Sequence, residues 1–304
     1  MDEIKIEESP KIPSEITNSA NLEKLCIFMG AGCSQLLDCP SWESLAKELV
    51  NSCYDCQELD FDFQDSKVLL DTQSPKEIIT ICKNLLSEKG LENRFENKIR
   101  ESLKYNLATE DLDYNIYKKL TRLSKRNITF VTTNVDNHFS RFPEIDVEFE
   151  NFTNYRPNTL YCIHGHIQKP ESMIFTVKDY LNKYKDPGFT KFLQNIFENK
   201  TVLFLGYGLN ELEVLDFLIS KGQELTTLQE KNHFILLPFF KNQKKLLRFK
   251  KLYYESLGVE VIPYSYDEKG FKQLYHIIDN WCESFELETL PSLHNQGDNI
   301  LDLM

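Results

Sequence analysis

Four short clusters of glycine and polar residues could bind a phosphorylated ligand and act on it. They read GAGCS at 30–34, TTNVD at 132–136, IHGHI at 163–167 and GYGLN at 206–210. Glycine lets the chain turn tightly behind a strand, so that backbone amides and a helix N-terminus can face a pyrophosphate. An asparagine amide donates and accepts hydrogen bonds without adding charge. A histidine with an ordinary pKa of about 6.5 can accept a proton at neutral pH.

Each cluster follows an apolar run that predicts a strand. The predicted strands are residues 25–29, 128–134, 159–165, 201–208, 233–238 and 258–264. Their nearly continuous apolar character is typical of strands covered on both faces. Helical patterns lie between several of them, at 41–54, 187–200, 210–220, 242–257 and 270–285. This alternation predicts an α/β fold with a Rossmann-like, doubly wound parallel sheet, in which the four clusters meet at the carboxyl ends of the strands.

The domain organisation has one irregular part. Residues from about 43 to 126 carry helical patterns without a convincing strand, which predicts a helical subdomain inserted after the first strand and helix. The two ends, 1–20 and 286–304, are polar and acidic, and we expect them to be mobile or ordered by a partner. The intervening residues 21–285 form the predicted nucleotide-binding domain.

Composition excludes several classes of function. The net charge of −12 argues against a surface that binds nucleic acid directly. No apolar run approaches the roughly 20 residues of a membrane span, and the N-terminus is acidic, unlike a signal peptide, so we expect a cytoplasmic protein without membrane contact. The basic pattern at 244–254 reads as a solvated helix face.

The 8 cysteines are scattered, which suits a reducing compartment. Cys53 and Cys56 form one CxxC pair, but no second pair follows at the spacing of a structural zinc site. We therefore expect two helix-borne thiols, no disulfide and no bound metal.

In order and spacing, the four clusters resemble those of the sirtuin superfamily over residues 24–265. The first cluster continues into PSWESLAKEL at 40–49, which looks similar to the sirtuin-like NAD⁺ hydrolases of bacterial antiphage defence. Sirtuin deacylases instead continue with an IPDFR-type segment and carry two cysteine pairs for zinc. The resemblance implies an NAD⁺ glycohydrolase that releases nicotinamide and ADP-ribose and depletes NAD⁺ during infection. The alternatives are an NAD-dependent lysine deacylase and a non-catalytic nucleotide-binding module.

The resemblance also assigns roles to residues. Asn134 would hold the attacking water or the ribose hydroxyls, and His164 would be the catalytic histidine. The residues implied in NAD⁺ binding are Gly30, Ala31, Gly32 and Ser34 at the phosphates, Thr133 and Asp136 at the nicotinamide ribose, and Gly206, Gly208 and Asn210 at the adenosine.

Each assignment has an alternative from the residues alone. Asn134 could cap the helix after its strand. His164 could be a core histidine, and His166 is the competing candidate, although Gly165 is expected to turn it away. His138 is expected only at the rim of the pocket.

Control of such an enzyme needs a second surface. After residue 265 only a helix and a short tail remain, which is too little for a sensor domain of roughly 100 residues. We therefore expect a homo-oligomer. The resemblance implies a separately encoded partner as well, such as a HerA-type ATPase or an Argonaute-like protein.

Overall fold

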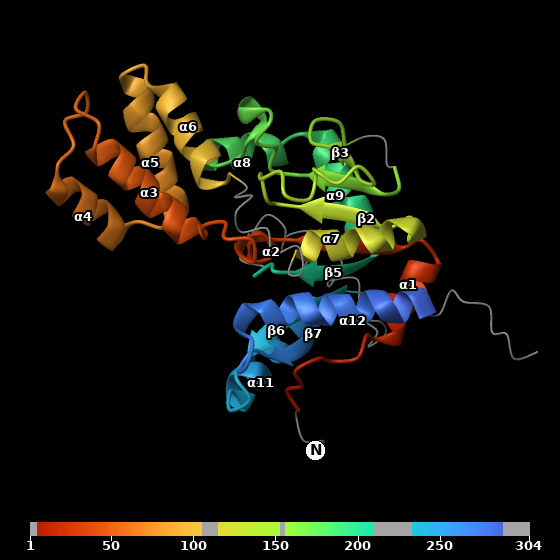
Figure 1. The fold of residues 1–304 in the computed structure, drawn as a ribbon. Helices are drawn as coiled ribbons and strands as arrows, with labels where there is room; N and C mark the ends of the chain where they lie inside the picture. The colour runs from red at the N-terminus through yellow and green to blue at the C-terminus, as the bar shows by residue number, and fades with distance from the viewer. Residues whose placement is uncertain (1–4, 105–114, 153–155, 209–232, 288–304) are drawn as a thin grey trace, which may run out of the picture.

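A parallel β-sheet forms the centre of the protein. The structure, a computed structural model, describes residues 5–104, 115–152, 156–208 and 233–287 (Figure 1). The strands are β1 Leu25–Met29, β2 Thr129–Thr132, β3 Asp146–Glu148, β4 Thr159–Cys162, β5 Thr201–Leu205, β6 His233–Phe239 and β7 Val259–Ser265. They pair in the order β3-β4-β2-β1-β5-β6-β7, and each pairing is parallel.

This sheet confirms the Rossmann-like α/β prediction. All six predicted strands form, with ends within three residues of the predicted ones. The strand that the sequence did not reveal is β3, an edge strand of three residues with two carboxylates and no apolar run.

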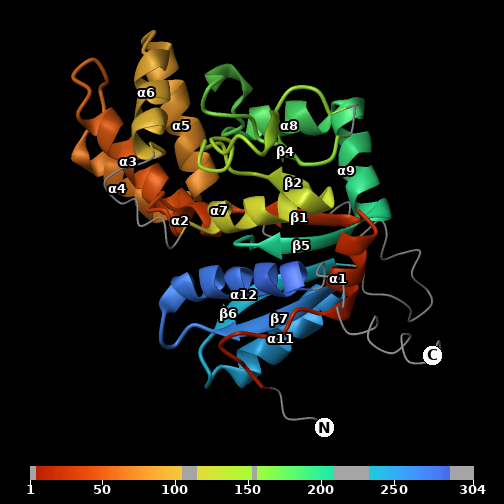
Figure 2. The ribbon, with the colours of Figure 1, turned by 45° about the vertical axis from the view of Figure 1, so that its right-hand side comes forward.

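Helices cover both faces of the sheet (Figure 2). One face packs against α1 Ser14–Asn21, α7 Ile116–Thr121 and α12 Gln273–Leu287, and the other against α9 Pro187–Asn199 and α11 Lys244–Glu255. Strand β1 shows the alternation: Leu25, Ile27 and Met29 join the first cluster, whereas Cys26 and Phe28 join the second. Burial on both sides explains why the strands read as continuous apolar runs.

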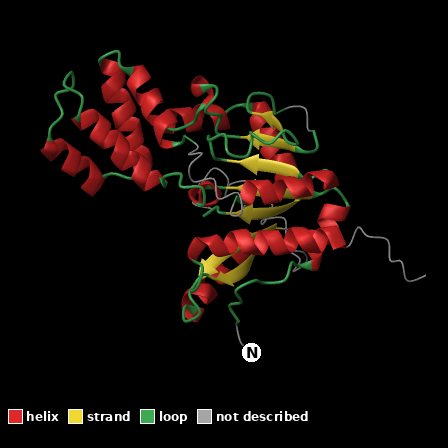
Figure 3. Ribbon diagram, viewed as in Figure 1, coloured by secondary structure: helices red, strands yellow, loops and turns green. Residues whose placement is uncertain are grey.

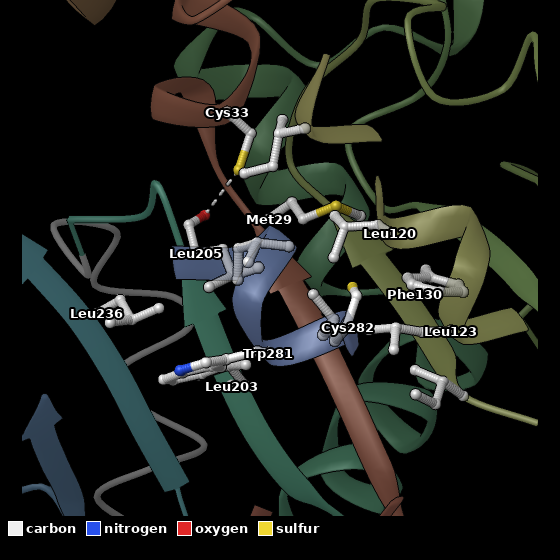
Figure 4. Packing of buried hydrophobic residues seen from close by; sticks show 14 of the residues in the cluster. Met29, Cys33, Leu120, Leu123, Phe130, Leu203, Leu205, Leu236, Trp281 and Cys282 are labelled. Carbon is white, nitrogen blue, oxygen red and sulfur yellow. Dashed lines mark hydrogen bonds between the residues drawn. The ribbon is translucent and has the colours of Figure 1, made fainter. Parts of the chain in front are cut away.

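The core beneath α12 is drawn in Figure 4. Trp281 and Cys282 of α12 lie over the strands, and the view shows Trp281 beside Leu203 and Cys282 beside Leu123. The same view shows the Cys33 thiol donating to the carbonyl of Leu205, at 3.4 Å. This contact ties the turn after β1 to the end of β5.

A group of helices projects from one end of the sheet (Figures 1 and 3). These are α3 Trp42–Tyr54, α4 Phe63–Thr72, α5 Pro75–Glu88 and α6 Glu92–Ser102, here called the helical module. Side-chain caps begin three of them: Ser41 for α3, Asp62 for α4 and Ser74 for α5. The module has its own apolar core, which also includes Val135 and Phe175 from the loops at the sheet edge. It is thereby anchored beside the carboxyl ends of the strands.

Residues 116–126, which the sequence assigned to the inserted subdomain, pack elsewhere. Ile116 and Leu120 of α7 join the core that contains β1. Lys119 and Arg122, the latter at the start of η3 Arg122–Arg126, both contact the Asp279 carboxylate of α12, at 2.8 and 3.0 Å. The helical pattern of this segment was recognisable, but its partner is a helix about 160 residues away.

The N-terminal segment also differs from the expectation of a mobile end. Ile6 is buried, Glu7 pairs with Tyr264 at the end of β7, and Trp281 donates its indole N–H to the Pro10 carbonyl at 2.8 Å. Residues 5–20 thus cover part of the sheet and α12, because their few apolar side chains find a site there. The predicted tail beyond residue 287 lies outside the described residues.

The remaining elements are short. They are α2 Ala31–Gln35, α8 Val177–Tyr184, η4 Pro170–Ser172 and η5 Gly270–Lys272. Among the helices that the structure describes, none has both the length and the apolar character required to span a membrane.

Candidate active site

A crevice lies where the chain changes direction in the sheet. Strand β1 lies between β2, the next strand along the chain, and β5, which the chain reaches after β4 by crossing to the other side of β1. Open α/β sheets bind ligands at this position, outside the carboxyl ends of the strands. Here α2 begins immediately after β1, and three pockets meet at Ala31. Their cavity volumes are about 50, 340 and 350 Å³, so the two larger pockets are within the range of small-molecule sites and the first is smaller.

We name the pockets by position. The inner pocket is lined by residues that include Ser34, Asn134, Asp136, Trp42 and Phe175. The apolar pocket lies between the glycine turn after β5 and the residues Leu236, Pro238, Tyr264 and Phe271. The middle pocket connects them and reaches Ser74, Pro75 and Lys76 of the helical module.

The glycines of the turn after β1 and of the turn after β5 allow these two turns to pack closely against each other. Gly30 N–H donates to the Leu205 carbonyl at 3.0 Å, and Gly32 N–H donates to the Gly206 carbonyl at 2.8 Å. A Cβ on Gly32 would lie 2.8 Å from the Gly206 Cα, and Gly206 itself has φ +57°. The two backbone amides that were expected to face phosphates therefore donate hydrogen bonds to carbonyls of the protein itself. The residues of the first turn that line pockets are Ala31, Gly32 and Ser34.

Asn134 lies at the centre of a polar network in the inner pocket. Its Nδ2 lies 2.9 Å from the Gly30 carbonyl, 2.9 Å from Ser34 Oγ and 3.2 Å from the Tyr117 hydroxyl. The Gly30 carbonyl can only accept, so it fixes the orientation of the amide. Among the described residues nothing donates to Oδ1, so this oxygen is available to a ligand. Asn134 is half-buried, and its backbone N–H donates to Thr132 Oγ1. Its side-chain amide holds the glycine turn and does not cap a helix.

Ser34, Tyr117 and Asp136 complete this network. The Ser34 hydroxyl donates to Asp136 Oδ2 at 2.6 Å, so the Tyr117 hydroxyl at 2.7 Å must donate to Ser34. Burial, reinforced by the nearby Asp136 charge, raises the pKa of Tyr117 well above its ordinary value and keeps it a donor. Asp136 Oδ1 accepts the backbone N–H of His138 at 3.0 Å. Ser34 thus positions Asn134 and Asp136, and its hydroxyl is fully used.

Both candidate histidines are buried outside the three pockets. They follow β4, two strands from β1. The His164 ring packs edge-on against the Tyr180 ring, with their centroids 5.0 Å apart, and Lys76 Nζ, of the middle pocket, lies 3.9 Å from the Tyr180 ring centroid. His166 contacts Ser140 Oγ through Nε2 at 2.9 Å, and its Nδ1 accepts the Gln168 N–H. Tyr180 therefore contacts both His164 and a residue that lines the crevice.

The other predicted binding residues are distributed along the crevice. Thr133 lines the inner and middle pockets, and Gly206 and Gly208 line the middle and apolar pockets. Asn210 lies outside the described residues. The apolar and aromatic walls near Gly206 suit a planar heterocyclic ring.

Sequence reasoning missed three residues of the site. Tyr117 was assigned to the insertion, Trp42 was noted only as part of the PSWESLAKEL stretch, and Phe175 was not singled out. Trp42 packs edge-on against Phe175 at 5.8 Å, and both line the inner pocket. No local signal marks Tyr117 or Phe175 as site residues, because each reaches the crevice from a different helix or loop.

The cysteines of the predicted CxxC pair lie in the helical module. The Cys53 thiol faces the Cys82 carbonyl, and Cys56 contacts the Glu58 carboxylate at 3.2 Å. In the part of the chain that the structure describes, the one group of side chains with metal-ligand character is Cys39, Asp136 and His138. His138 is fully buried there, not at the pocket rim as predicted.

Comparison with known proteins gives two similarities. Residues 128–262 match the family described as the SIR2-like domain. The chain is also 24% identical, over 261 residues, to Defense-associated sirtuin 2 of Bacillus subtilis. The aligned region covers 82% of this chain and 24% of that protein, so the chain spans about a quarter of the length of this relative.

Proposed function

We propose that this chain hydrolyses NAD⁺ to nicotinamide and ADP-ribose. The premise is the match of residues 128–262 to the SIR2-like domain family. The observation that supports this most directly is the Asn134 amide. Its nitrogen is held by Gly30, Ser34 and Tyr117, and its oxygen is left for a ligand. A fixed acceptor of this kind can orient a ribose hydroxyl or a water molecule for attack.

The crevice has parts suited to each portion of NAD⁺. The adenine ring fits the apolar pocket, beside Tyr264 and Phe271. The pyrophosphate would cross the start of α2 at Ala31, the residue shared by all three pockets. The nicotinamide riboside would then enter the inner pocket, where Asn134 and Asp136 lie.

The chemistry follows from the residues of the inner pocket. Breaking the nicotinamide–ribose bond builds positive charge at the anomeric carbon, which the Asp136 carboxylate is placed to stabilise. The attacking water donates a hydrogen bond to Asn134 Oδ1 while its oxygen bonds to that carbon, and nicotinamide leaves. His164 is proposed to receive the proton; because His164 is buried against Tyr180 outside the three pockets, this step requires the site to rearrange.

Incubation with NAD⁺ alone separates the candidate functions. A hydrolase releases nicotinamide and ADP-ribose without any peptide. A deacylase releases nicotinamide only with an acyl-lysine peptide, and a binding module releases none while its melting temperature still rises with NAD⁺. Failure to release nicotinamide under any of these conditions, including in the presence of operon neighbours, would contradict the proposal.

We also propose that the protein acts in antiphage defence, as the name of its relative indicates for that protein. NAD⁺ depletion during infection would be the effect. The test is to express the chain with its operon neighbours, challenge the cells with phage, and compare NAD⁺ levels with those in cells carrying Asn134→Ala.

Self-association is the form of control that the surface best supports. On α11, Leu246, Phe249, Leu252 and Tyr253 are exposed among lysines. On α4, Phe63, Val68 and Leu70 are exposed among Asp62, Asp65 and Asp71. We propose that the basic apolar face of α11 binds the acidic apolar face of α4 in a second copy. A separately encoded partner, such as a HerA-type ATPase or an Argonaute-like protein, remains a proposal from the resemblance.

A further inference from the structure

We infer that Cys39, Asp136 and His138 form a binding site for a divalent transition metal ion of the zinc type, in the wall of the inner pocket. These residues come from the loop after α2 and from the loop after β2. No part of this site overlaps the CxxC pair of the helical module.

The geometry brings three metal ligands together. One ligand atom from each residue lies within 4.8 Å of the other two. The Cys39 sulfur and His138 Nε2 are 2.9 Å apart, although 99 positions separate them in the chain. Ligands bound at about 2.0–2.3 Å around a tetrahedral zinc ion lie roughly 3.3–3.8 Å from one another, so small side-chain rotations suffice.

The loop that carries two of the ligands is already ordered. The Asp136 carboxylate accepts the His138 N–H at 3.0 Å and the Ser34 hydroxyl at 2.6 Å, which limits its movement. All three ligand residues are at most 8% exposed. A prearranged and nearly dry set of ligands loses little conformational freedom when it binds an ion.

The charge and chemistry of the ligands favour a cation. A bound M²⁺ forms a bond to the Cys39 sulfur, and the thiol proton leaves to solvent. Thiolate, imidazole and carboxylate together suit zinc more than magnesium or calcium.

Two of the ligands also line the inner pocket. Cys39 and Asp136 both contribute to its wall, so a fourth coordination position can face the crevice. An ion there would engage the carboxylate that now holds Ser34. If the proposed function is correct, metal occupancy would compete with NAD⁺ hydrolysis, but metal binding itself does not depend on that function.

Cobalt(II) is the probe that distinguishes this site from adventitious ions. The full chain, stripped with a chelator, is titrated with Co²⁺ and then with Zn²⁺ in competition. We expect one Co²⁺ per chain, with a thiolate-to-cobalt charge-transfer band that zinc removes. We expect Cys39→Ser to abolish the band and His138→Asn to weaken binding at least 10-fold, consistent with the loss of a ligand.

A matched control uses a cysteine outside the cluster. Cys56→Ser, in the turn that follows α3, should bind cobalt with the same band and affinity as the wild type. Circular dichroism and melting of each variant show whether it is folded. If Cys39→Ser unfolds, His138→Asn and a pH titration of the proton released by the wild type still test the assignment. Binding weaker than that of a free chelating dipeptide, or a band that survives both substitutions, overturns the inference.

Discussion

At the scale of single residues, the inner pocket depends on side chains whose hydrogen bonds allow only one orientation of the polar group. Asn134 is held by a backbone carbonyl, a serine and a tyrosine from three different elements. The amide therefore contributes positioning, and its removal leaves the apolar core unchanged. This separation allows catalysis and stability to be tested independently.

Asn134→Ala should reduce nicotinamide release at least 100-fold, because the fixed acceptor is lost. The melting temperature should change little, since Asn134 is only half-buried. Asn137→Ala, three residues along the same loop, is the control and should retain activity. Equal activity of both variants would remove Asn134 from the proposed mechanism.

His164→Ala should also abolish hydrolysis, whereas His166→Ala should be milder. Both rings are buried, so each variant must be shown by circular dichroism to fold. A Tyr180→Ala variant tests access as well: if this ring covers His164, its removal should change KM or kcat. The reverse order of the two histidine variants would show that His166 is the functional one.

His166 links folding to pH. Burial lowers the pKa of His166 below its ordinary value, against the opposing Asp136 charge, and protonation would cost the bond from the Gln168 N–H. The unfolded chain takes up this proton near pH 6.5, while the folded chain does so only at lower pH. The contribution of His166 to the free energy of unfolding is therefore fully present above about pH 6.5 and is lost as the pH falls below that value. Thermal melting between about pH 7 and about pH 5 should show this loss, with a shallower slope for His166→Gln. The same dependence of melting temperature on pH in the wild type and in His166→Gln would contradict this role of His166.

At the scale of elements, the two glycine turns form one structural unit. The turn after β1 and the turn after β5 exchange backbone hydrogen bonds across the point where the sheet changes direction. The start of α2 is therefore positioned by β5 as much as by β1. The crevice should fail when this contact is disturbed, even if the sheet survives.

Gly206→Ala tests this contact. At φ +57° an alanine is strained, and its Cβ would lie 2.5 Å from the Cys33 nitrogen. Gly90→Ala is the matched control, because Gly90 has φ +69° but no atom within 4 Å of the added Cβ. The control should lose roughly 1–2 kcal/mol of unfolding free energy from strain alone, and Gly206→Ala should lose clearly more. Urea denaturation measures both, and equal losses would show that the turns do not need this close contact.

At the scale of the whole molecule, charge and apolar surface are unevenly distributed. The chain carries a net charge of −12, yet α11 presents a basic face with exposed aromatic side chains. A head-to-tail contact between α11 and α4 of another copy would close into a ring or extend as a filament, depending on the angle.

The paired substitution Phe249→Ser with Leu252→Ser should lower the molar mass in light scattering at a given concentration. Leu22→Ser is the control, since Leu22 is 66% exposed but lies at the end of α1. Higher salt should weaken the assembly as well, because the charges are exposed. A wild-type chain that stays monomeric at every concentration would exclude this contact.

The sequence by itself determined six of the seven described strands, the parallel sheet and the four clusters expected at its carboxyl edge. Those features depend on local periodicity and on the rule that parallel strands end at one edge, so they can be read from short stretches. Only the tertiary structure decided that Tyr117 contacts Asn134, that Tyr180 packs against His164, and that Cys39 contacts His138. These contacts join residues from different elements, and a side chain's neighbours depend on how the elements pack rather than on its own local pattern.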